Sequence, residues 1–269
     1  MKLASVPTDL TEGDGELPTW PPLLATRGRG ARSATHMHHA MHIVLALEGH
    51  LTVTAPSPGG GGSGRGSAKD SAPIRAAGVL TAPDVPHAIE ADGAEVLLVF
   101  LDPESDVGSA LRAVLPGPVR IVSAAERDQL VGDADPMAIM QAGGVAWTQR
   151  AVSVLGGASV GETPRPMHPR VRKVLKLLRT MPADSDTSLE ALAEAVSLSP
   201  GRLMHAFSES IGVPLRPYLA WLKLQRATAA IVSGVPLAQA AHAAGFADAA
   251  HMTRTFRRMF GMSPSMLVR

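Results

Sequence analysis

The chain has 269 residues, a hydrophobic fraction of 45% and no cysteine. This length suits two ordinary domains, each able to bury its own core. The lack of cysteine excludes disulfides, thiolate metal sites and thiol catalysis, so only histidines and carboxylates remain as metal ligands. No apolar run approaches the ~18 residues of a membrane span, and residues 1–18 lack a signal peptide's apolar core, so we expect a cytoplasmic protein without membrane contact.

The net charge of +1 hides a strong asymmetry between the two ends of the chain. Residues 1–164 carry 11 Lys and Arg against 18 Asp and Glu, whereas residues 165–269 carry 14 against 6. The first part is therefore acidic and the second basic. A basic module of this size favours nucleic acid as a partner, although an ordinary solvated surface accounts for the charge equally well.

Short apolar or alternating runs separated by Gly, Pro and Asp predict a mostly β N-terminal part. They occupy residues 43–55, 78–83 and 94–101. The glycine-rich residues 56–67 predict a flexible loop between two strands, because the Lys-Ser/Thr ending of a phosphate loop is missing.

Helical spacing begins at Glu104. A capping box at Ser123 and Glu126, and a cap with a first-turn proline at Asp135-Pro136, predict two helix starts. A shared face, which serves either as core or as a subunit contact, is formed by Met140, Gly144, Trp147, Ala151 and Val154. Gly and Pro are frequent in residues 156–170, where the charge also changes, so this stretch predicts a linker.

Beyond the linker, one supersecondary unit occurs twice, at residues 188–214 and 236–264. The copies superpose with an offset of 48 residues over the first helix and 49 over the second. Each predicts a helix, a tight turn and a second helix, which is the helix-turn-helix plan.

The ends of these helices carry capping signals. Thr187 and Glu190 predict a capping box, and Ser199-Pro200 predicts the start of the next helix. In the second copy, Gly245 is placed at the turn and Asp248 caps the helix that follows.

The outward faces of the two second helices are candidate DNA-binding surfaces, because small residues and cations there can approach base edges. Arg254 can bind guanine through two hydrogen bonds, His205 can donate to an acceptor, and Ala250 can contact a thymine methyl group. The full candidate set is Gly201, Arg202, Met204, His205, Ser208, Ala249, Ala250, Thr253, Arg254, Arg257 and Arg258.

Arg258 and two further cations, Lys223 and Arg226, are placed for phosphates, which supply affinity without sequence information. An amphipathic helix at residues 215–232 separates the two copies. At ~1.5 Å per residue it spans roughly 27 Å, which would help to set two recognition helices about one DNA turn, ~34 Å, apart. One chain could then read two successive major grooves.

Residues 189–231, followed by 237–265 with a closing GF(x)DxxHxxRxFRRxFGxSP pattern at 245–264, resemble the DNA-binding domain of AraC/XylS-type transcription regulators. The resemblance covers about the last 100 residues. It implies a bacterial activator or repressor that binds double-stranded DNA, contacts RNA polymerase and forms a homodimer through the helices at 104–155. Gly201 and Ala249-Ala250 depart from the bulkier or polar residues frequent in the family, so the base preference is not carried over.

Regulators of this kind commonly place a cupin-like β-barrel before the DNA-binding domain. The first cupin motif can be laid on Gly30, His36, His38, His42 and Gly49, with His42 standing where the family has a glutamate. The second motif resembles residues 82–87, where Asp84 replaces a glycine.

Strand alternation would place His36, His38 and His42 on one face, joined by His87 from a neighbouring strand. Three uses remain open for these imidazoles: binding a divalent metal ion, lining a metal-free pocket for an organic effector, or satisfying core hydrogen bonds. His39 and His50 are expected to be ordinary, partly exposed residues.

The resemblance and the patterns together predict an α+β protein. A cupin-like effector-sensing barrel occupies residues 1–110, a helical region and linker 111–165, and a double helix-turn-helix domain with its linker helix 166–269. The function predicted is a non-enzymatic DNA-binding regulator controlled by a small-molecule or metal effector, with no certain cofactor. The alternatives are a metal-dependent cupin enzyme, with Glu48 as base, fused to a DNA-binding domain, and a constitutive DNA binder.

Overall fold

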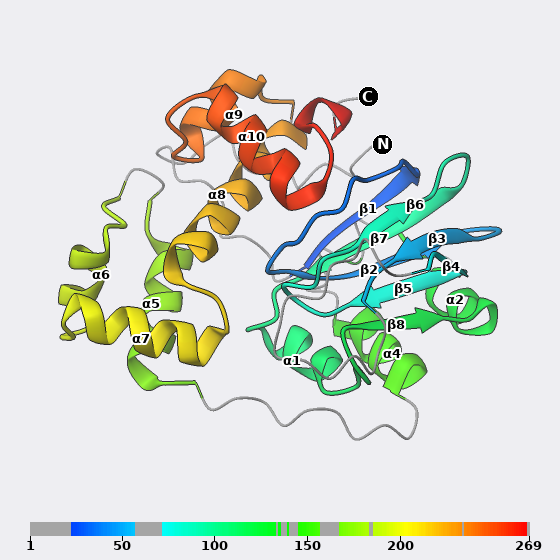
Figure 1. Ribbon diagram of the computed structural model, residues 1–269, viewed down its shortest axis with the longest axis horizontal. Coiled ribbons are helices and arrows are strands. Elements are labelled where there is room, and N and C mark those ends of the chain that lie inside the picture. The colour runs from blue at the N-terminus through cyan, green and yellow to red at the C-terminus, as the bar shows by residue number, and fades with distance from the viewer. Residues whose placement is uncertain are drawn as a thin grey trace. The chain divides into compact units, whose positions relative to one another are not determined.

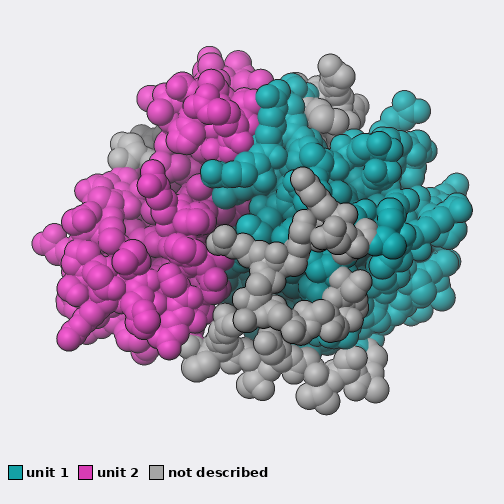
Figure 2. Space-filling view, in the orientation of Figure 1, with its two compact units in different colours: residues 1–6, 21–163, 256–269 teal, residues 7–20, 164–255 magenta. Residues whose placement is uncertain are grey.

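The structure is a computed structural model. It describes residues 23–56, 72–132, 134–135, 139, 145–156, 167–182, 185–232 and 234–267. The described residues among 23–156 and 256–267 pack into one compact unit, and those among 167–255 into a second (Figure 2). None of the described helices is both long and apolar enough to cross a membrane.

The first unit contains a five-stranded antiparallel sheet, in the order β1-β7-β2-β5-β8 (Figure 1). Its central strand β2 is buried along its whole length, which explains its nearly continuous apolar sequence. The strands are β1 (Leu23–Arg29), β2 (Met41–Ala46), β5 (Gly78–Thr81), β7 (Glu95–Leu101) and β8 (Val119–Val122).

A second, three-stranded sheet has the order β4-β3-β6. It consists of β3 (Leu51–Thr54), β4 (Ile74–Ala76) and β6 (Ala88–Glu90). The β-rich character of this part is confirmed. The expected barrel is not formed by the described strands, because they divide into two sheets and the larger one is open at β1 and β8. The predicted loop at 56–67 falls mostly outside the described residues.

The described residues of this unit also form the helices α1 (Asp106–Arg112), α2 (Ala124–Val131) and α4 (Val145–Gly156). The capping box at Ser123 and Glu126 is confirmed, with both of its hydrogen bonds present. On the predicted face of α4, Trp147 and Ala151 are buried, and Trp147 Nε1 donates to the Leu130 carbonyl over 3.0 Å. Pro136, Met140 and Gly144 lie outside the described residues.

The strand β8 is not predicted by the sequence pattern, which indicates helical spacing from Glu104 onward. It pairs with β5 from Thr81↔Val119 to Gly78↔Val122. Only four residues long, β8 is too short to show a clear period of two, and its partner lies about forty residues away in sequence. A single-sequence pattern therefore could not separate it from the helices on either side.

The helices of the C-terminal part are α5 (Pro169–Thr180), α6 (Leu189–Ala195), α7 (Pro200–Ile211), α8 (Leu215–Val232), α9 (Leu237–Ala243), α10 (Ala249–Phe260) and the short η2 (Pro264–Leu267). The internal repeat is confirmed: α6 and α9 begin 48 residues apart, and α7 and α10 begin and end 49 residues apart. The spacer helix α8 also has the predicted bounds.

Both turns of the repeat use a left-handed residue before the second helix. Gly245 has φ of 76°, as predicted for the turn of the second copy. The equivalent residue of the first copy is Ser197, with φ of 54°. The two turns therefore share one backbone conformation despite different residues. In this conformation the Cβ of Ser197 has a steric cost that glycine avoids.

The helix caps mostly follow the sequence signals. Ser199 caps α7 with Pro200 at its start, and Asp248 Oδ1 accepts from the His251 backbone in the first turn of α10. The predicted box at Thr187 and Glu190 is wrong by one residue, because the Ser188 side chain accepts from the Ala191 backbone N–H. Adjacent Thr and Ser are equivalent as capping signals, so the sequence did not distinguish them.

A single core holds the first helix-turn-helix together. It joins one face each of α5, α6 and α7 to the start of α8 through fully buried side chains such as Val174, Leu203, Phe207 and Tyr218. The rings of Phe207 and Tyr218 meet edge to face at 5.3 Å. The position of the outward face of α7 is therefore fixed by packing on its opposite side.

Two cations expected at DNA phosphates instead stabilise the helical unit internally. Lys223 Nζ donates to the Gly245 carbonyl over 2.7 Å, at the turn between α9 and α10. Arg226 Nη2 donates to the carbonyls of Leu178 and Met181 over 3.2 and 3.0 Å, at the end of α5. Basic side chains commonly complete carbonyls left unpaired at a helix end.

Replacing Arg226 with alanine should therefore lower the free energy of unfolding by about 1–3 kcal/mol, because two part-buried carbonyls lose their donor. Chemical denaturation of the full chain measures this change. Arg216→Ala is the matched control, since Arg216 is exposed on the same helix. Equal stabilities for the two variants would contradict the capping role.

Candidate nucleic-acid interface and histidine site

The helix α7 is amphipathic, with one face buried and the other turned to solvent. Leu203, Phe207 and Ile211 are buried on the inner face. The predicted outward residues are placed as follows: Gly201, Arg202, Met204 and His205 are exposed, and Ser208 is partly exposed. Met204 is 52% exposed, so its side chain is available on this face.

The helix α10 repeats this arrangement. Met252, Phe256 and Phe260 are buried. Of the predicted residues, Ala250, Arg254, Arg257 and Arg258 are exposed, whereas Ala249 and Thr253 are partly exposed. Its outward face is more basic than that of α7, where exposed Glu209 lies 3.9 Å from His205.

Sequence reasoning missed His251. It is exposed in the first turn of α10 and lies three and seven residues before Arg254 and Arg258, so the three side chains share a helical face. Its ring packs edge-on against Phe246 at 5.4 Å, which orients it. The spacing of these three basic residues was the signal available in the sequence.

The structure brings the four predicted histidines of the first unit together. His36, His38, His42 and His87 are 8%, 3%, 3% and 1% exposed. His36 and His87 form an isolated antiparallel bridge with two backbone hydrogen bonds of 2.9 Å, and His42 lies in β2 beside Phe100 of β7. The expected strand begins only at Met41, so an irregular segment rather than strand alternation presents His36 and His38.

The four rings form one continuous cluster. The His87 ring centroid lies 4.3 Å from that of His36, 4.6 Å from His42 and 5.2 Å from His38. The His38 and His42 centroids are 4.9 Å apart. Because burial is nearly complete, the cluster is separated from bulk solvent.

Hydrogen bonds determine the tautomers of three of these rings. Nδ1 of His36, His38 and His87 lies 2.8, 2.8 and 2.7 Å from the carbonyl oxygens of Ala34, Ala40 and Val85. A carbonyl oxygen can only accept, so each Nδ1 carries the proton and donates. In the neutral ring, Nε2 then carries the lone pair.

Burial lowers the pKa of all four imidazoles, because removal from water penalises the charged form. For His87 the pKa falls to about 3. The other rings of the cluster lower the pKa of His38, His42 and His87 further. The cluster is therefore uncharged at neutral pH, the state in which imidazole binds a metal ion.

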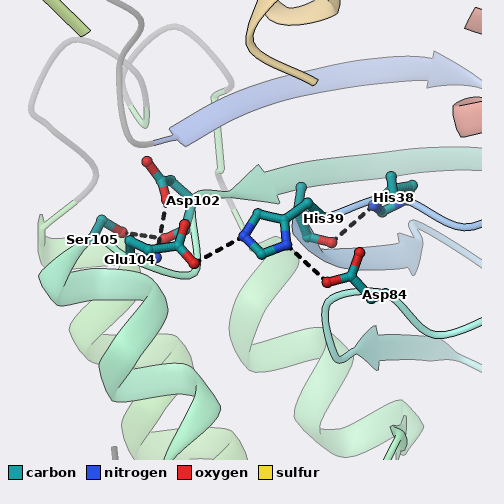
Figure 3. A network of polar contacts seen from close by, with 7 residues as sticks. His38, His39, Asp84, Asp102, Glu104 and Ser105 are labelled. Carbon is teal, nitrogen blue, oxygen red and sulfur yellow. Dashed lines mark hydrogen bonds and ion pairs between the residues drawn. The ribbon is translucent and has the colours of Figure 1, made fainter. Parts of the chain in front are cut away.

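His39 contradicts the expectation of a partly exposed residue, since its side chain is only 4% exposed. Figure 3 shows its ring between two carboxylates. Nδ1 donates to Asp84 Oδ2 over 2.8 Å, and Nε2 donates to Glu104 Oε1 over 2.9 Å. Burial alone would lower the pKa of His39, but these two hydrogen bonds outweigh it and raise the pKa to about 10.

This ion-pair network joins three segments of the first unit. Glu104 is held on the turn before α1, where Ser105 caps the helix and Asp102 Oδ1 accepts the Glu104 backbone N–H over 3.0 Å. Asp84 has φ of 60° where the cupin motif has glycine, and its backbone N–H donates to the His38 carbonyl over 2.8 Å. The network thus holds the chain beside the imidazole cluster.

A cavity of about 220 Å³ borders the histidines. His36 and His42 contribute polar edges to it, and most of the remaining lining is apolar, including Val44, Ile89, Leu98 and Phe100. Phe260 and Met262, which belong to the same compact unit, also line it. The arrangement suits a small, largely apolar ligand with one group that meets imidazole nitrogen.

Glu48, proposed as an enzymatic base on the same face as the histidines, is exposed and is not among the residues that line the cavity. The strand β2 ends at Ala46, so the alternation on which that placement depended does not continue to Glu48.

Sequence comparison identifies the C-terminal part of the chain. Residues 192–269 match the family described as "Helix-turn-helix domain". The arabinose operon regulatory protein of Escherichia coli is 33% identical over 104 residues, which are 37% of this chain and 35% of that protein. The match therefore spans about a third of the length of that curated relative.

Solved structures of ToxT from Vibrio cholerae are similar over nearly the whole chain. An apo variant has a TM-score of 0.58 at 9% identity, covering 92% of this chain and 97% of that one. The unsaturated fatty acid bound form has a TM-score of 0.55 at 10% identity, covering 91% and 94%. At these identities the likeness establishes the fold: an N-terminal β-sheet domain followed by helical helix-turn-helix units. Residues 192–269 therefore form a helix-turn-helix domain similar in sequence to that of the arabinose operon regulatory protein.

Proposed function

We propose that the chain is a sequence-specific, DNA-binding transcription regulator whose activity is set by an effector bound in its cupin-like N-terminal domain. The observation that carries this proposal is the paired presentation of α7 and α10. Both helices bury their apolar faces and expose small or basic residues at equivalent positions of a repeat. Two such surfaces in one chain favour recognition of two successive sites on a duplex.

The candidate DNA-binding residues fall into two groups, those whose side chains suit contacts with bases and those that suit phosphates. Arg254 in α10 suits two hydrogen bonds to guanine, and His205 in α7 suits an acceptor on a base edge. Ala250 leaves room for a thymine methyl group. Arg257 and Arg258, in the last turn of α10, suit phosphates and supply affinity rather than sequence preference.

The effector is assigned to the cavity beside His36 and His42, whose rings contact those of His38 and His87. A partly open cavity with a mostly apolar lining and a few polar groups is the common form of a small-ligand site. A structure of ToxT was determined with an unsaturated fatty acid bound, so a protein of this fold does take up a small, largely apolar molecule. The effector can change DNA binding only by its different affinity for the two states of the protein.

Dimerisation through the helices at residues 104–155 and contact with RNA polymerase belong to the same proposal. Both depend on the family resemblance. A regulator is favoured over a fused enzyme because Glu48 is exposed and does not line the cavity. The carboxylates of Asp84 and Glu104 are bound to His39.

Selection of duplexes from a random library with the full-length chain tests this function, because no operator sequence is needed in advance. We expect a defined consensus sequence. Enrichment of no sequence above the starting library would contradict specific recognition.

Binding to the selected duplex should also depend steeply on salt. If about 6 phosphates are neutralised, the slope of log affinity against log salt concentration should be near −5. Arg258→Ala should reduce the size of this slope by about 1, since one phosphate contact is lost. Arg75→Ala, an exposed cation of β4, is the matched control, and an equal change in both variants would show a general charge effect.

A further inference from the structure

The imidazole cluster has the composition and spacing of a metal site. His36, His38 and His87 each offer one ring nitrogen, and these three nitrogens lie within 4.8 Å of one another. Zinc–imidazole bonds are about 2.0–2.1 Å long, so modest side-chain rotations would allow all three nitrogens to reach one ion. Among the described residues, no other group of three histidines or carboxylates has its ligand atoms this close together.

The backbone orients these rings for ligation. Each Nδ1 donates to a carbonyl two residues away in sequence, in Ala34, Ala40 and Val85. This arrangement fixes the ring plane, leaves the lone pair on Nε2 and increases its basicity. Histidines that bind metals almost always donate their second nitrogen to such an acceptor.

The cluster also contains buried polar atoms that the described residues do not satisfy. One of them is Nε2 of His87, which is buried without a hydrogen-bond partner among these residues. A buried ring nitrogen without a partner is unfavourable, and a bound metal ion can supply the missing partner.

The donor set indicates the class of metal. Three neutral imidazoles without a carboxylate suit first-row transition metals such as zinc, nickel, copper or cobalt, whereas magnesium and calcium prefer oxygen ligands. The carboxylates of Asp84 and Glu104 lie beyond the cluster and are held by His39.

We propose that His36, His38 and His87 bind one divalent first-row transition metal ion through their Nε2 atoms. The ion would form part of the effector site of the proposed regulator. Metal binding itself does not depend on that function, whereas an effect of the ion on DNA binding rests on it. The ligands come from an irregular segment before β2 and from the bridge that joins it to His87, so the ion would fasten two separate parts of the first unit.

Titration of the untagged full-length chain, stripped with a chelator, tests this site. Calorimetry with Zn²⁺ and visible absorption with Co²⁺ should each show one equivalent bound. His36→Gln and His87→Gln should each weaken binding by at least about 100-fold, since a direct ligand is lost. His50→Gln, an exposed histidine of the same unit, should bind as the parent chain does.

Circular dichroism of each variant separates ligand loss from unfolding, because a folded His87→Gln chain without metal affinity supports the site. Weak binding that is equal in the parent chain and in both ligand variants would overturn the proposal. So would stoichiometric binding that both variants retain. Loss of metal binding with intact DNA recognition would refute the site alone, whereas one bound ion in a chain that recognises no DNA would refute the proposed function and support the site.

Discussion

Replacing His39 with alanine should lower the free energy of unfolding of the N-terminal unit by about 3–5 kcal/mol. The substitution removes the donor shared by Asp84 and Glu104, and leaves the Glu104 carboxylate, only 5% exposed, without this partner in a buried environment. Removing one member of a buried ion pair costs more than the pair contributes, because the remaining charge keeps its desolvation penalty. Chemical denaturation followed by circular dichroism measures the change.

The pH dependence of this difference is a second signature. The pKa of His39 in the folded chain, about 10, lies above its ordinary value of 6.5. The stabilisation is therefore fully present below about pH 6.5 and is lost as the pH rises through 10. His50→Ala is the control, because His50 is exposed. A His39→Ala chain as stable as this control would show that the network contributes nothing.

Replacing Arg254 with alanine should weaken binding to the selected duplex by about 1–3 kcal/mol and relax the preference at one base position. Arg254 is exposed on the outward face of α10, and its partner in this proposal is the edge of a guanine. Binding to unrelated DNA should change much less, because phosphate contacts supply that affinity. Titration of labelled duplexes with single-base changes measures both quantities.

Arg75→Ala again provides the comparison, since it removes an exposed positive charge outside the two helix-turn-helix units. If Arg254→Ala weakened binding equally on all sequences, Arg254 would contact a phosphate rather than a base. If neither affinity changed, α10 would not be a recognition helix.

The helical part could be predicted largely from sequence because its signals are local. The repeat, the cap at Ser199-Pro200 and the bounds of α8 depend on residues close together in the chain, and all are observed. The outward faces of α7 and α10 followed from helical periodicity in the same way. The cap of α6 was predicted at Thr187 but lies at Ser188, because neighbouring Thr and Ser residues can cap a helix in the same way.

The sheets were harder to predict because their strands are short and their partners are distant. The three-residue strands β4 and β6 offer no periodicity, and each lies beside β3 in the smaller sheet. Closure into a barrel was inferred from resemblance rather than from residues, and the described strands form two sheets instead.

Individual polar side chains were the least predictable feature. Lys223 and Arg226 suit phosphate contacts equally well in sequence, because the carbonyls that they bind lie 22 and up to 48 residues away. His39 likewise meets carboxylates 45 and 65 residues away. Histidine density did indicate that His36, His38 and His42 would gather, since they lie within seven residues, and the resemblance supplied His87.

In the proposed function, α7 and α10 of one chain read two sites on the same duplex. This arrangement can be tested by duplex selection with the parent chain, with His205→Ala and with Arg254→Ala. We expect two selected sequence blocks whose centres lie about 10–10.5 base pairs apart, with His205→Ala relaxing one block and Arg254→Ala the other. A single block, or two variants that relax the same block, would contradict it.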